Sequence, residues 1–340
     1  MKAIILEEPG RFAYAEVDFN PRLQPHEALL KVRSIGICGT DYHAYRGNQP
    51  FFSYPRVLGH ELGVEVMEVG SDVTHTKPGH RCSVEPYLNT TQDQAVRSGF
   101  TNCGENISVI GVHEDGGMCE YLKLPAQYLH PSRVLDYDQL ALVEPLGIGC
   151  HAVNRGRVSD DDCVLVVGAG PIGLAAVQFA TATRARTVVM DVNTDRLAFA
   201  ASLMDVMGTV VAGQDDTVEQ LRLHFDGDLP TVVLDATGSP HSMAKALEYA
   251  APAGRIIFIG LFQGDFTFHD PYFHKKELTI MASRNALSAD FEQIIQMMEQ
   301  RAINTNAWIT HRSSFDDMVS QFDGWLQPEA QVIKAMVSVG

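Results

Sequence analysis

The chain has 340 residues, which is long for one hydrophobic core and suits two domains. Its formal net charge of −16 argues against nucleic-acid binding, which needs clustered Lys and Arg, and against docking on an anionic membrane surface. No apolar run approaches the roughly 18 residues of a membrane-spanning helix. The six scattered cysteines fit the free thiols of a cytoplasmic protein better than a disulfide framework.

The residues up to about 150 are predicted to form short strands separated by Gly and Pro turns. The clearest candidates cover 1–6, 28–33, 63–70 and 79–84. The first is too short for the core of a signal peptide, because it breaks off at Glu7-Glu-Pro-Gly10. Several short strands at such spacing predict a β-barrel-like or sandwich-like domain.

From Asp162 onward, candidate strands alternate with candidate helices. The segment 163–167 is apolar throughout, as is typical of a parallel strand covered on both faces. Further strands are expected at 187–191, 209–212, 231–235, 255–260 and 278–283, with helices at 172–182, 196–203, 218–223 and 243–250. This alternation predicts a doubly wound parallel sheet. The tail from about residue 286, with a helix at 291–300, is too short to fold alone and must pack on one of the two domains.

A glycine-rich turn lies between the strand 163–167 and the helix that follows it. Gly168 allows a tight turn, Gly170 allows close approach to a pyrophosphate, and Gly173 lets the helix press on the strand. Pro171 and Ile172 open the helix, whose N-terminal N–H groups favour phosphate. The flanking strand and helix favour dinucleotide binding over a glycine turn without a ligand.

Asp191 ends the second strand of this domain, 18 residues after Gly173. A carboxylate at this position binds the adenosine ribose hydroxyls and repels a 2′-phosphate, which predicts NAD rather than NADP. Arg196 could weaken that preference, although we expect it to cover the adenine edge. The alternative is that Asp191 is a solvated turn residue.

Four residues outside this domain offer metal-ligand chemistry: Cys38, His60, Glu61 and Glu144. A thiolate, an imidazole and carboxylates suit a tetrahedral zinc that keeps one position open for water or substrate. Taken singly, a cysteine is usually a small buried hydrophobe, and a His or Glu is usually solvated. The residue types alone therefore leave a metal site and ordinary structural roles equally open.

The chain also resembles the zinc-containing medium-chain dehydrogenases over nearly its whole length. The matching segments occur in the order of that family: Ile35-Gly-Ile-Cys-Gly-Thr-Asp, Leu58-Gly-His-Glu, Pro78-Gly-His-Arg, Asp115-Gly-Gly, Glu144-Pro-Leu and Gly168-Ala-Gly-Pro-Ile-Gly. The Glu144-Pro-Leu segment is similar to the polyol branch, with its sorbitol and threonine dehydrogenases. The segments 47–60, 270–271, 273–278 and 283–286 resemble the bacterial L-galactonate 5-dehydrogenases, which oxidise a hexonate to a keto-acid.

The resemblance implies an α/β protein with a GroES-like β-rich catalytic domain and a doubly wound Rossmann domain. The catalytic domain would cover 1–149 and 287–340, and the Rossmann domain 150–286. Relatives form homodimers or homotetramers, and we expect one of these here. The implied function is zinc-dependent transfer of a hydride from a secondary alcohol of a sugar acid to NAD.

The same resemblance assigns candidate roles around the metal. Cys38 and His60 match zinc ligands, and Glu61 and Glu144 match positions that bind the metal or hold its water. Thr40 and His43 match a proton relay. A hexonate carboxylate would need a cation as its partner. The candidates are Arg46, Arg56, Lys275, Lys276 and Arg284, although such residues are more often surface charges or cofactor contacts. Arg284 is expected nearest to the ligand, because it follows the last predicted strand.

Two departures from the family pattern stand out. The four positions that hold a structural zinc in many relatives match Thr90, Asp93, Val96 and Gly104, none of them a thiol, and Cys103 is one residue out of place. We therefore expect no structural zinc and a lobe held by packing alone. The second departure is Gly63-Val64, where relatives usually carry the glycine one position later, which leaves the local strand geometry open.

Two other functions remain open at this stage. One is a polyol or L-threonine dehydrogenase with the same metal chemistry. The other, from a different class, is a zinc-free NAD(P)-binding protein that acts as a redox sensor or a structural subunit.

Overall fold

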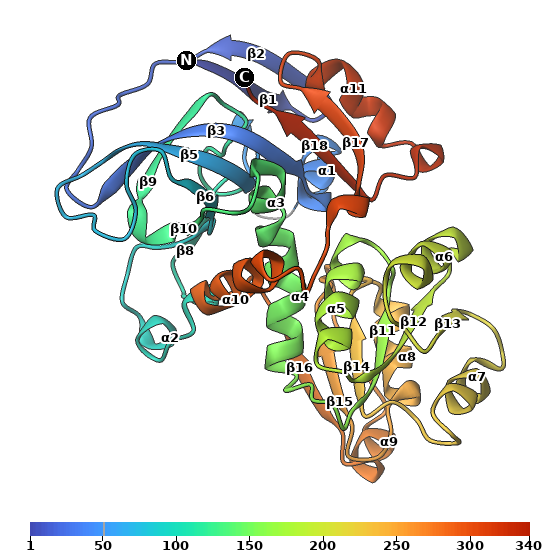
Figure 1. Ribbon diagram of the computed structural model, residues 1–340. Coiled ribbons are helices and arrows are strands. Elements are labelled where there is room, and N and C mark those ends of the chain that lie inside the picture. The colour runs from blue at the N-terminus through green and yellow to red at the C-terminus, as the bar shows by residue number, and fades with distance from the viewer. Residues whose placement is uncertain (50–51) are drawn as a thin grey trace. The chain divides into compact units, whose positions relative to one another are not determined.

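The computed structural model describes residues 1–49 and 52–340 (Figure 1). Pro50 and Phe51, which belong to the 47–60 segment quoted above, lie outside the described residues. The chain forms two compact units, which we call the first unit (Met1–Pro145 and Leu287–Gly340) and the second unit (Leu146–Ala286). The sequence analysis places the first boundary four residues later, after residue 149. No helix in the described part of the chain has the length and apolar character needed to cross a membrane.

The first unit is rich in β-structure, as expected. Its largest sheet has seven strands in the order β10-β6-β5-β3-β18-β17, and β9 also pairs with β3. The strands of this sheet are β3 (Glu27–Ile37), β5 (Glu61–Val69), β6 (Arg81–Val84), β9 (Tyr121–Pro125), β10 (Leu129–Ser132), β17 (Ile309–Ser314) and β18 (Lys334–Ser338). Two smaller sheets contain β1 (Lys2–Glu8), β2 (Arg11–Glu16) and β4 (Arg56–Val57) in one, and β7 (Tyr87–Asn89) and β8 (Ile107–Val109) in the other.

The C-terminal tail completes the first unit, as the length of the tail predicts. Its strand β18 pairs antiparallel with β3, with Ala335 opposite Ile37, and parallel with β17. The helices of this unit are α1 (Gly39–Tyr45), α2 (Gln94–Arg97), α3 (Tyr137–Ala141), α10 (Ser288–Glu299) and α11 (Met318–Trp325). Phe322 of α11 packs into the same core as Ile35 and Leu62. Strands from both ends of the chain thus share one hydrophobic core.

The unusual glycine at position 63 has a clear structural role. A Cβ atom there would lie 2.0 Å from the backbone oxygen of Tyr137, so α3 could not approach β5 with any larger residue. The β3–β5 register also shifts between Val32 and Ser34, where Ser34 pairs with Gly63. The local geometry left open by the sequence is therefore a bulge next to a close helix contact.

The lobe that carries structural zinc in many relatives is tied by a carboxylate in this chain. Asp93 caps α2: its Oδ1 accepts a hydrogen bond from the N–H of Val96 at 3.0 Å, and its Oδ2 accepts one from the N–H of Glu105 at 2.7 Å. Asn89 donates to the backbone oxygen of Thr101 at 2.8 Å. The expectation that packing alone holds this lobe is wrong, because the short polar side chains bond to backbone groups that packing would leave unsatisfied.

The second unit is the expected doubly wound parallel sheet. Its six strands follow the order β13-β12-β11-β14-β15-β16, and every neighbouring pair is parallel. They are β11 (Cys163–Val167), β12 (Arg186–Asp191), β13 (Gly208–Val211), β14 (Val232–Asp235), β15 (Arg255–Phe258) and β16 (Thr279–Ala282). Figure 1 shows helices on both sides of this sheet, namely α5 (Pro171–Ala182), α6 (Thr194–Leu203), α7 (Thr217–His224) and α8 (Pro240–Tyr249), with α9 (Asp270–Lys275) before β16.

One helix, α4 (Val143–Arg155), begins in the first unit and continues in the second. Within the second unit it packs tightly on α5, since a Cβ atom on Gly149 would lie 2.5 Å from the backbone carbon of Ala175. The strand order reverses between β11 and β14, and the carboxyl ends of strands at such a point form the ligand crevice of doubly wound folds.

Candidate metal centre and cofactor site

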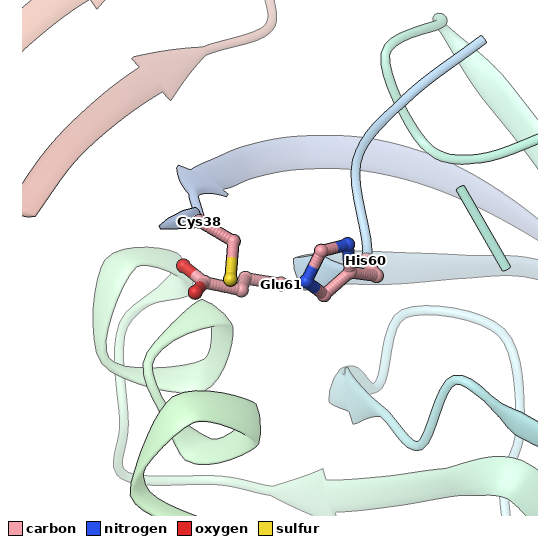
Figure 2. A group of neighbouring side chains, drawn as sticks. All are labelled: Cys38, His60 and Glu61. Atoms are coloured by element: carbon pink, nitrogen blue, oxygen red, sulfur yellow. The ribbon is translucent and has the colours of Figure 1, made fainter. Parts of the chain in front are cut away.

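The end of β3 leads directly into the first candidate metal ligand. Cys38 follows the last strand residue, Ile37, and caps the N-terminus of α1. Its backbone N–H donates to Asp41 Oδ2 at 2.8 Å, which fixes the turn between strand and helix. Cys38 is half-buried, and its side chain points toward Glu61 and His60 (Figure 2).

His60 and Glu61 lie at the start of the neighbouring strand, β5. The preceding Gly59 adopts a φ of +95°, a conformation that favours glycine. Glu61 lies opposite Gly36 of β3, and a Cβ atom at Gly36 would sit 2.0 Å from Glu61 Oε2. A glycine in β3 is therefore what leaves room for the Glu61 side chain.

The side chains of Cys38, His60 and Glu61 converge (Figure 2). One ligand atom from each lies within 4.8 Å of the other two, and His60 and Glu61 are buried. Zinc bonds of about 2.0–2.3 Å need ligand atoms somewhat closer together than this, which small side-chain rotations supply. The donor set of soft sulfur, imidazole nitrogen and carboxylate oxygen fits zinc.

The electrostatics around His60 favour a cation. Burial lowers the pKa of His60, but the negative charges of Cys38, Asp41 and Glu144 outweigh burial and hold it well above its usual value. Among the described residues, neither His60 Nδ1 nor Asp41 Oδ1 has a hydrogen-bond partner, and these two atoms lie 3.9 Å apart. Asp41 therefore stands where a carboxylate can orient a metal-binding imidazole.

Glu61 forms a buried ion pair with Lys334, which the sequence analysis did not single out. Lys334 Nζ lies 2.6 Å and 2.7 Å from the two carboxylate oxygens, and it also donates to the backbone oxygen of Ile37 at 3.3 Å. Burial lowers the pKa of Lys334, but the charges of Glu61 and Cys38 raise it overall, so the amine stays protonated. Both oxygens of Glu61 thus already have a cationic partner.

Glu144 is not part of the three-residue cluster, although it contributes charge to it. It lies in the first turn of α4 and is buried. The hydroxyl of the buried Tyr87 donates a hydrogen bond to Glu144 Oε1. Burial raises the pKa of Glu144, partly offset by His60.

The expected relay residues share one short helix. Thr40 and His43 are three positions apart in α1, so they lie on the same face. Thr40 is half-buried and His43 is exposed. This gradient is suited to carrying a proton from a buried group to solvent.

The glycine-rich turn has the geometry of a phosphate cradle. Gly168 adopts a φ of +97°, and a Cβ atom at Gly173 would lie 1.7 Å from the backbone oxygen of Gly168. Gly170 caps α5, and Pro171 and Ile172 form its first turn. A Cβ atom at Gly170 would meet nothing closer than an Arg196 nitrogen at 3.9 Å, so the space above this residue is open to a ligand.

A cavity of about 620 Å³ lies beside this turn, entirely within the second unit. Gly168, Gly170, Asp191 and Arg196 all line it, as the sequence analysis expects of residues that bind a cofactor. Asp191 is held firmly, because its Oδ2 accepts from the N–H of Ala169 at 2.6 Å and its Oδ1 from that of Asn193 at 2.8 Å. The cavity thus offers glycine backbone for phosphate and a fixed carboxylate for a ribose.

The candidate cations for a substrate carboxylate differ in how they are used. Lys276 caps α8 by donating to the backbone oxygens of Leu247, Glu248 and Ala250. Arg56 contacts Asp115 at 3.4 Å, and Arg46 is exposed and donates to a backbone oxygen at 3.1 Å. Lys275 ends α9, and Arg284 lies just beyond the carboxyl end of β16.

Comparison with known proteins agrees with this architecture. The sequence profile described as "Alcohol dehydrogenase GroES-like domain" matches residues 24–134, and "Zinc-binding dehydrogenase" matches 171–300. The chain is 40% identical over 338 residues to the L-galactonate-5-dehydrogenase of Escherichia coli (strain K12), covering 99% of both chains. The chain belongs to the zinc-containing medium-chain dehydrogenases. It is an NAD(P)-dependent oxidoreductase of the zinc-dependent alcohol and polyol dehydrogenase type.

Solved structures of other dehydrogenases have the same fold as this one. An alcohol dehydrogenase from E. coli CFT073, complexed with NADH, superposes with a TM-score of 0.91 at 29% identity, covering 99% of each chain. A zinc-binding dehydrogenase from Sinorhizobium meliloti 1021, bound to NADP, superposes with a TM-score of 0.90 at 26% identity, covering 99% of this chain and 98% of that one. The predicted fold class and family are confirmed.

Three residues of this dehydrogenase's candidate metal centre escaped the sequence analysis. Asp41 had a local signal, since it stands three residues after Cys38 at the end of the Cys-Gly-Thr-Asp segment. Tyr87 and Lys334 had none, because they are 57 and 273 residues distant from their partners.

Proposed function

We propose that this dehydrogenase oxidises a secondary alcohol of a sugar acid, an L-galactonate-like hexonate, to a keto-acid and passes the hydride to NAD. The single observation that carries the proposal is the meeting of Cys38 and His60 among acidic side chains, with Glu61 within 4.8 Å and Glu144 adding to the negative charge at His60, in a chain of this family. The identity of 40% with an L-galactonate-5-dehydrogenase supports the substrate class.

The proposed metal site holds one zinc per chain. Cys38 and His60 are two of its ligands, and a carboxylate is the third. Proximity favours Glu61, whereas charge favours Glu144, because both oxygens of Glu61 are already paired with Lys334. We choose Glu144. If Glu61 left Lys334 to bind the metal, the buried lysine would keep an uncompensated charge, and breaking such a pair costs about 3–5 kcal/mol of stability. Glu61 is the alternative third ligand, or it holds the water molecule bound to the metal.

A zinc ion bound there would supply Lewis acidity, which lowers the pKa of the substrate hydroxyl and stabilises charge on its oxygen. The protein's own residues supply the rest. Asp41, whose Oδ1 lies 3.9 Å from His60 Nδ1, would orient the imidazole once a small rotation closes that distance to a hydrogen bond. Thr40, the nicotinamide ribose and His43 would form the proton relay. The Thr40 hydroxyl would accept the proton of the substrate hydroxyl as it gives its own proton to the ribose, and His43, which is exposed, would pass a proton on to water.

The proposed redox partner is NAD rather than NADP. Asp191 lines the cofactor cavity, and its carboxylate would accept from the ribose hydroxyls and repel a 2′-phosphate. Arg196 lines the same cavity and is the residue that could moderate this preference. Pro171, Ile172 and Gly173 would support the pyrophosphate from the first turn of α5.

Arg284 is our candidate for the cation that contacts the substrate carboxylate or the cofactor, because it follows β16 at the carboxyl end of the sheet. The first unit would serve as the catalytic domain and the second as the cofactor domain. A homodimer or homotetramer is proposed because relatives in this family form such oligomers. Thr90, Val96 and Gly104 offer no ligand suited to zinc, so no structural zinc is proposed in the lobe of Asp93.

Turnover tests the substrate proposal. Purified enzyme with NAD is offered L-galactonate, other hexonates, sorbitol and L-threonine, and NADH formation is followed by absorbance. A kcat/KM for a hexonate at least ten times that for the polyol and the amino acid supports the proposal. The reverse order would make the chain a polyol or threonine dehydrogenase.

Metal analysis tests the chemistry independently of the substrate. About one zinc per chain after gel filtration supports the metal site. No zinc in protein that still binds NADH would favour the remaining alternative, a zinc-free NAD(P)-binding sensor or structural subunit.

A further inference from the structure

Tyr87 is a buried side chain whose hydroxyl bonds to Glu144, an acidic residue beside the cluster of Cys38, His60 and Glu61. It belongs to β7, is only 2% exposed, and its hydroxyl donates to Glu144 Oε1. We propose that Tyr87 positions Glu144 for the metal, holding Oε1 with its phenol so that Oε2 is presented to the ion. The proposal rests on the proposed function, which makes Glu144 a metal ligand.

The hydrogen-bond inventory of Glu144 supports this role. Tyrosine has one proton to donate, and an ionised carboxylate has two acceptor oxygens. Within residues 1–49 and 52–340, the Glu144 carboxylate has no other hydrogen-bond partner. One oxygen is therefore engaged and the other remains available.

Glu61, which belongs to the cluster, and Glu144, which lies outside it, are held in different ways. Glu61 is paired with the cation of Lys334, which neutralises its charge. Glu144 is held by a neutral phenol, which fixes the carboxylate in place and leaves its negative charge for a metal ion. A neutral donor is the partner that a ligand carboxylate needs if it is to be oriented without losing its attraction for zinc.

The Tyr87 ring is itself held in place by its neighbours. It packs edge-on against Phe291 of α10, with ring centroids 6.4 Å apart and planes at 76°. Phe291 stacks on His130 at 4.9 Å, and His130 Nε2 lies 3.0 Å from Glu85 Oε2. Ser288, at the start of α10, donates to the same Glu85 oxygen at 2.7 Å. These linked side chains, Phe291, His130, Glu85 and Ser288, restrict the Tyr87 phenol to one orientation, and precise placement of a metal ligand requires such restriction.

Tyr87→Phe is the direct test, because it keeps the ring and its packing and removes only the hydroxyl. Loss of such an outer hydrogen bond weakens metal binding by roughly 10- to 100-fold in other metal sites, and we expect the same range here. Zinc affinity is measured by competition with a chromogenic chelator. The absorption spectrum of the Co²⁺-substituted protein reports the ligand geometry and should also change.

Tyr128→Phe is the matched control. Tyr128 is another buried tyrosine of the first unit, but its hydroxyl accepts from the N–H of Asn89 at 2.9 Å instead of contacting Glu144. We expect its zinc affinity and Co²⁺ spectrum to match the unmodified enzyme. Urea unfolding of each EDTA-treated variant, compared with the unmodified protein, confirms that the first unit is folded.

A double-mutant cycle shows whether Tyr87 acts through Glu144. In a Glu144→Gln background, adding Tyr87→Phe should change zinc affinity by less than about twofold, because coupled residues are not additive. An equal loss in both backgrounds would overturn the inference, since Tyr87 would then act by another route. So would a Tyr87→Phe enzyme with unchanged zinc affinity and Co²⁺ spectrum, while the proposed function would stand. If the unmodified enzyme binds no zinc, the proposed function itself fails and the inference falls with it.

Discussion

Lys334 Nζ lies 2.6 Å and 2.7 Å from the two carboxylate oxygens of Glu61, and both side chains are almost fully buried. The pair joins β18, near the end of the chain, to β5, which starts beside His60. It holds one acidic residue of the candidate metal centre in a fixed, neutralised state. Removing either partner alone would leave a charge inside the first unit.

The Lys334→Met variant should therefore lose stability. Breaking a buried pair by removing one partner destabilises by about 3–5 kcal/mol, and a second change, Glu61→Gln, should restore most of that loss. Urea unfolding of EDTA-treated protein measures both effects. Lys2→Met is the control, because Lys2 forms an exposed pair with Asp316 at 3.9 Å and should change stability by less than about 1 kcal/mol. If the single and double variants at positions 334 and 61 are equally unstable, the ion pair is not the cause.

Replacing a metal ligand should separate turnover from cofactor binding. Cys38→Ser is expected to lower kcat by more than about 1000-fold, because a bound metal contributes several kcal/mol of charge stabilisation. NADH binding, followed by fluorescence, should be unchanged, because the cofactor cavity is built from the second unit. Cys103→Ser, at an exposed cysteine, should keep full activity. A parallel loss of NADH binding in Cys38→Ser would indicate misfolding instead.

The cofactor preference should depend on Asp191. In Asp191→Ser the adenosine ribose loses a charged hydrogen-bond acceptor worth about 1.5–3 kcal/mol. The kcat/KM for NAD should therefore fall roughly 10- to 100-fold, and the ratio of kcat/KM for NADP to that for NAD should rise. Steady-state kinetics with both cofactors measures the ratio. Asp205→Ser, at an exposed aspartate, is the control and should leave the ratio unchanged. An unchanged ratio in Asp191→Ser would remove the basis for choosing NAD.

The lobe tied by Asp93 should loosen in acid. The N–H of Val96 is the main cause that lowers the pKa of Asp93, with a further contribution from the N–H of Glu105. A carboxyl whose pKa is depressed on folding stabilises the fold fully above its unfolded pKa of about 4, and that contribution is lost as the pH falls through the folded value. Hydrogen-exchange protection factors over residues 89–105, which correct for the pH dependence of intrinsic exchange, should therefore fall below that pH.

The Asp93→Asn variant provides the comparison for this pH effect. Its amide oxygen can accept one of the two hydrogen bonds but does not titrate in this range. Protection factors in the lobe should be lower than in the unmodified chain at neutral pH and should not fall further in acid. If both proteins show the same acid response, another group controls the lobe.

Much of the fold could be predicted from local patterns. The uniformly apolar segment 163–167 and the strand–helix alternation after it predict the parallel sheet. The prediction works because the burial of each element can be inferred from the apolar residues of that element alone. The glycine turn at 168–173 could also be predicted from the sequence. The positive φ of Gly168 and the close backbone contact at Gly173 leave no room for a side chain, so the structural requirement appears directly as glycine. The lobe was misjudged because Asp93 acts on the N–H of Glu105, twelve positions away, and no periodicity records that contact.

The sequence by itself determined the two-domain organisation, the cofactor turn and the kinds of ligand atom on offer, because these follow from composition, periodicity and short motifs. Only the tertiary structure decided which of these side chains meet. The pairing of β3 with β5 and β18 brings Cys38, His60 and Glu61 together and sets Lys334 against Glu61. The physical reason is that ligand geometry depends on strand register and on which partners are buried together, and both are properties of long-range packing.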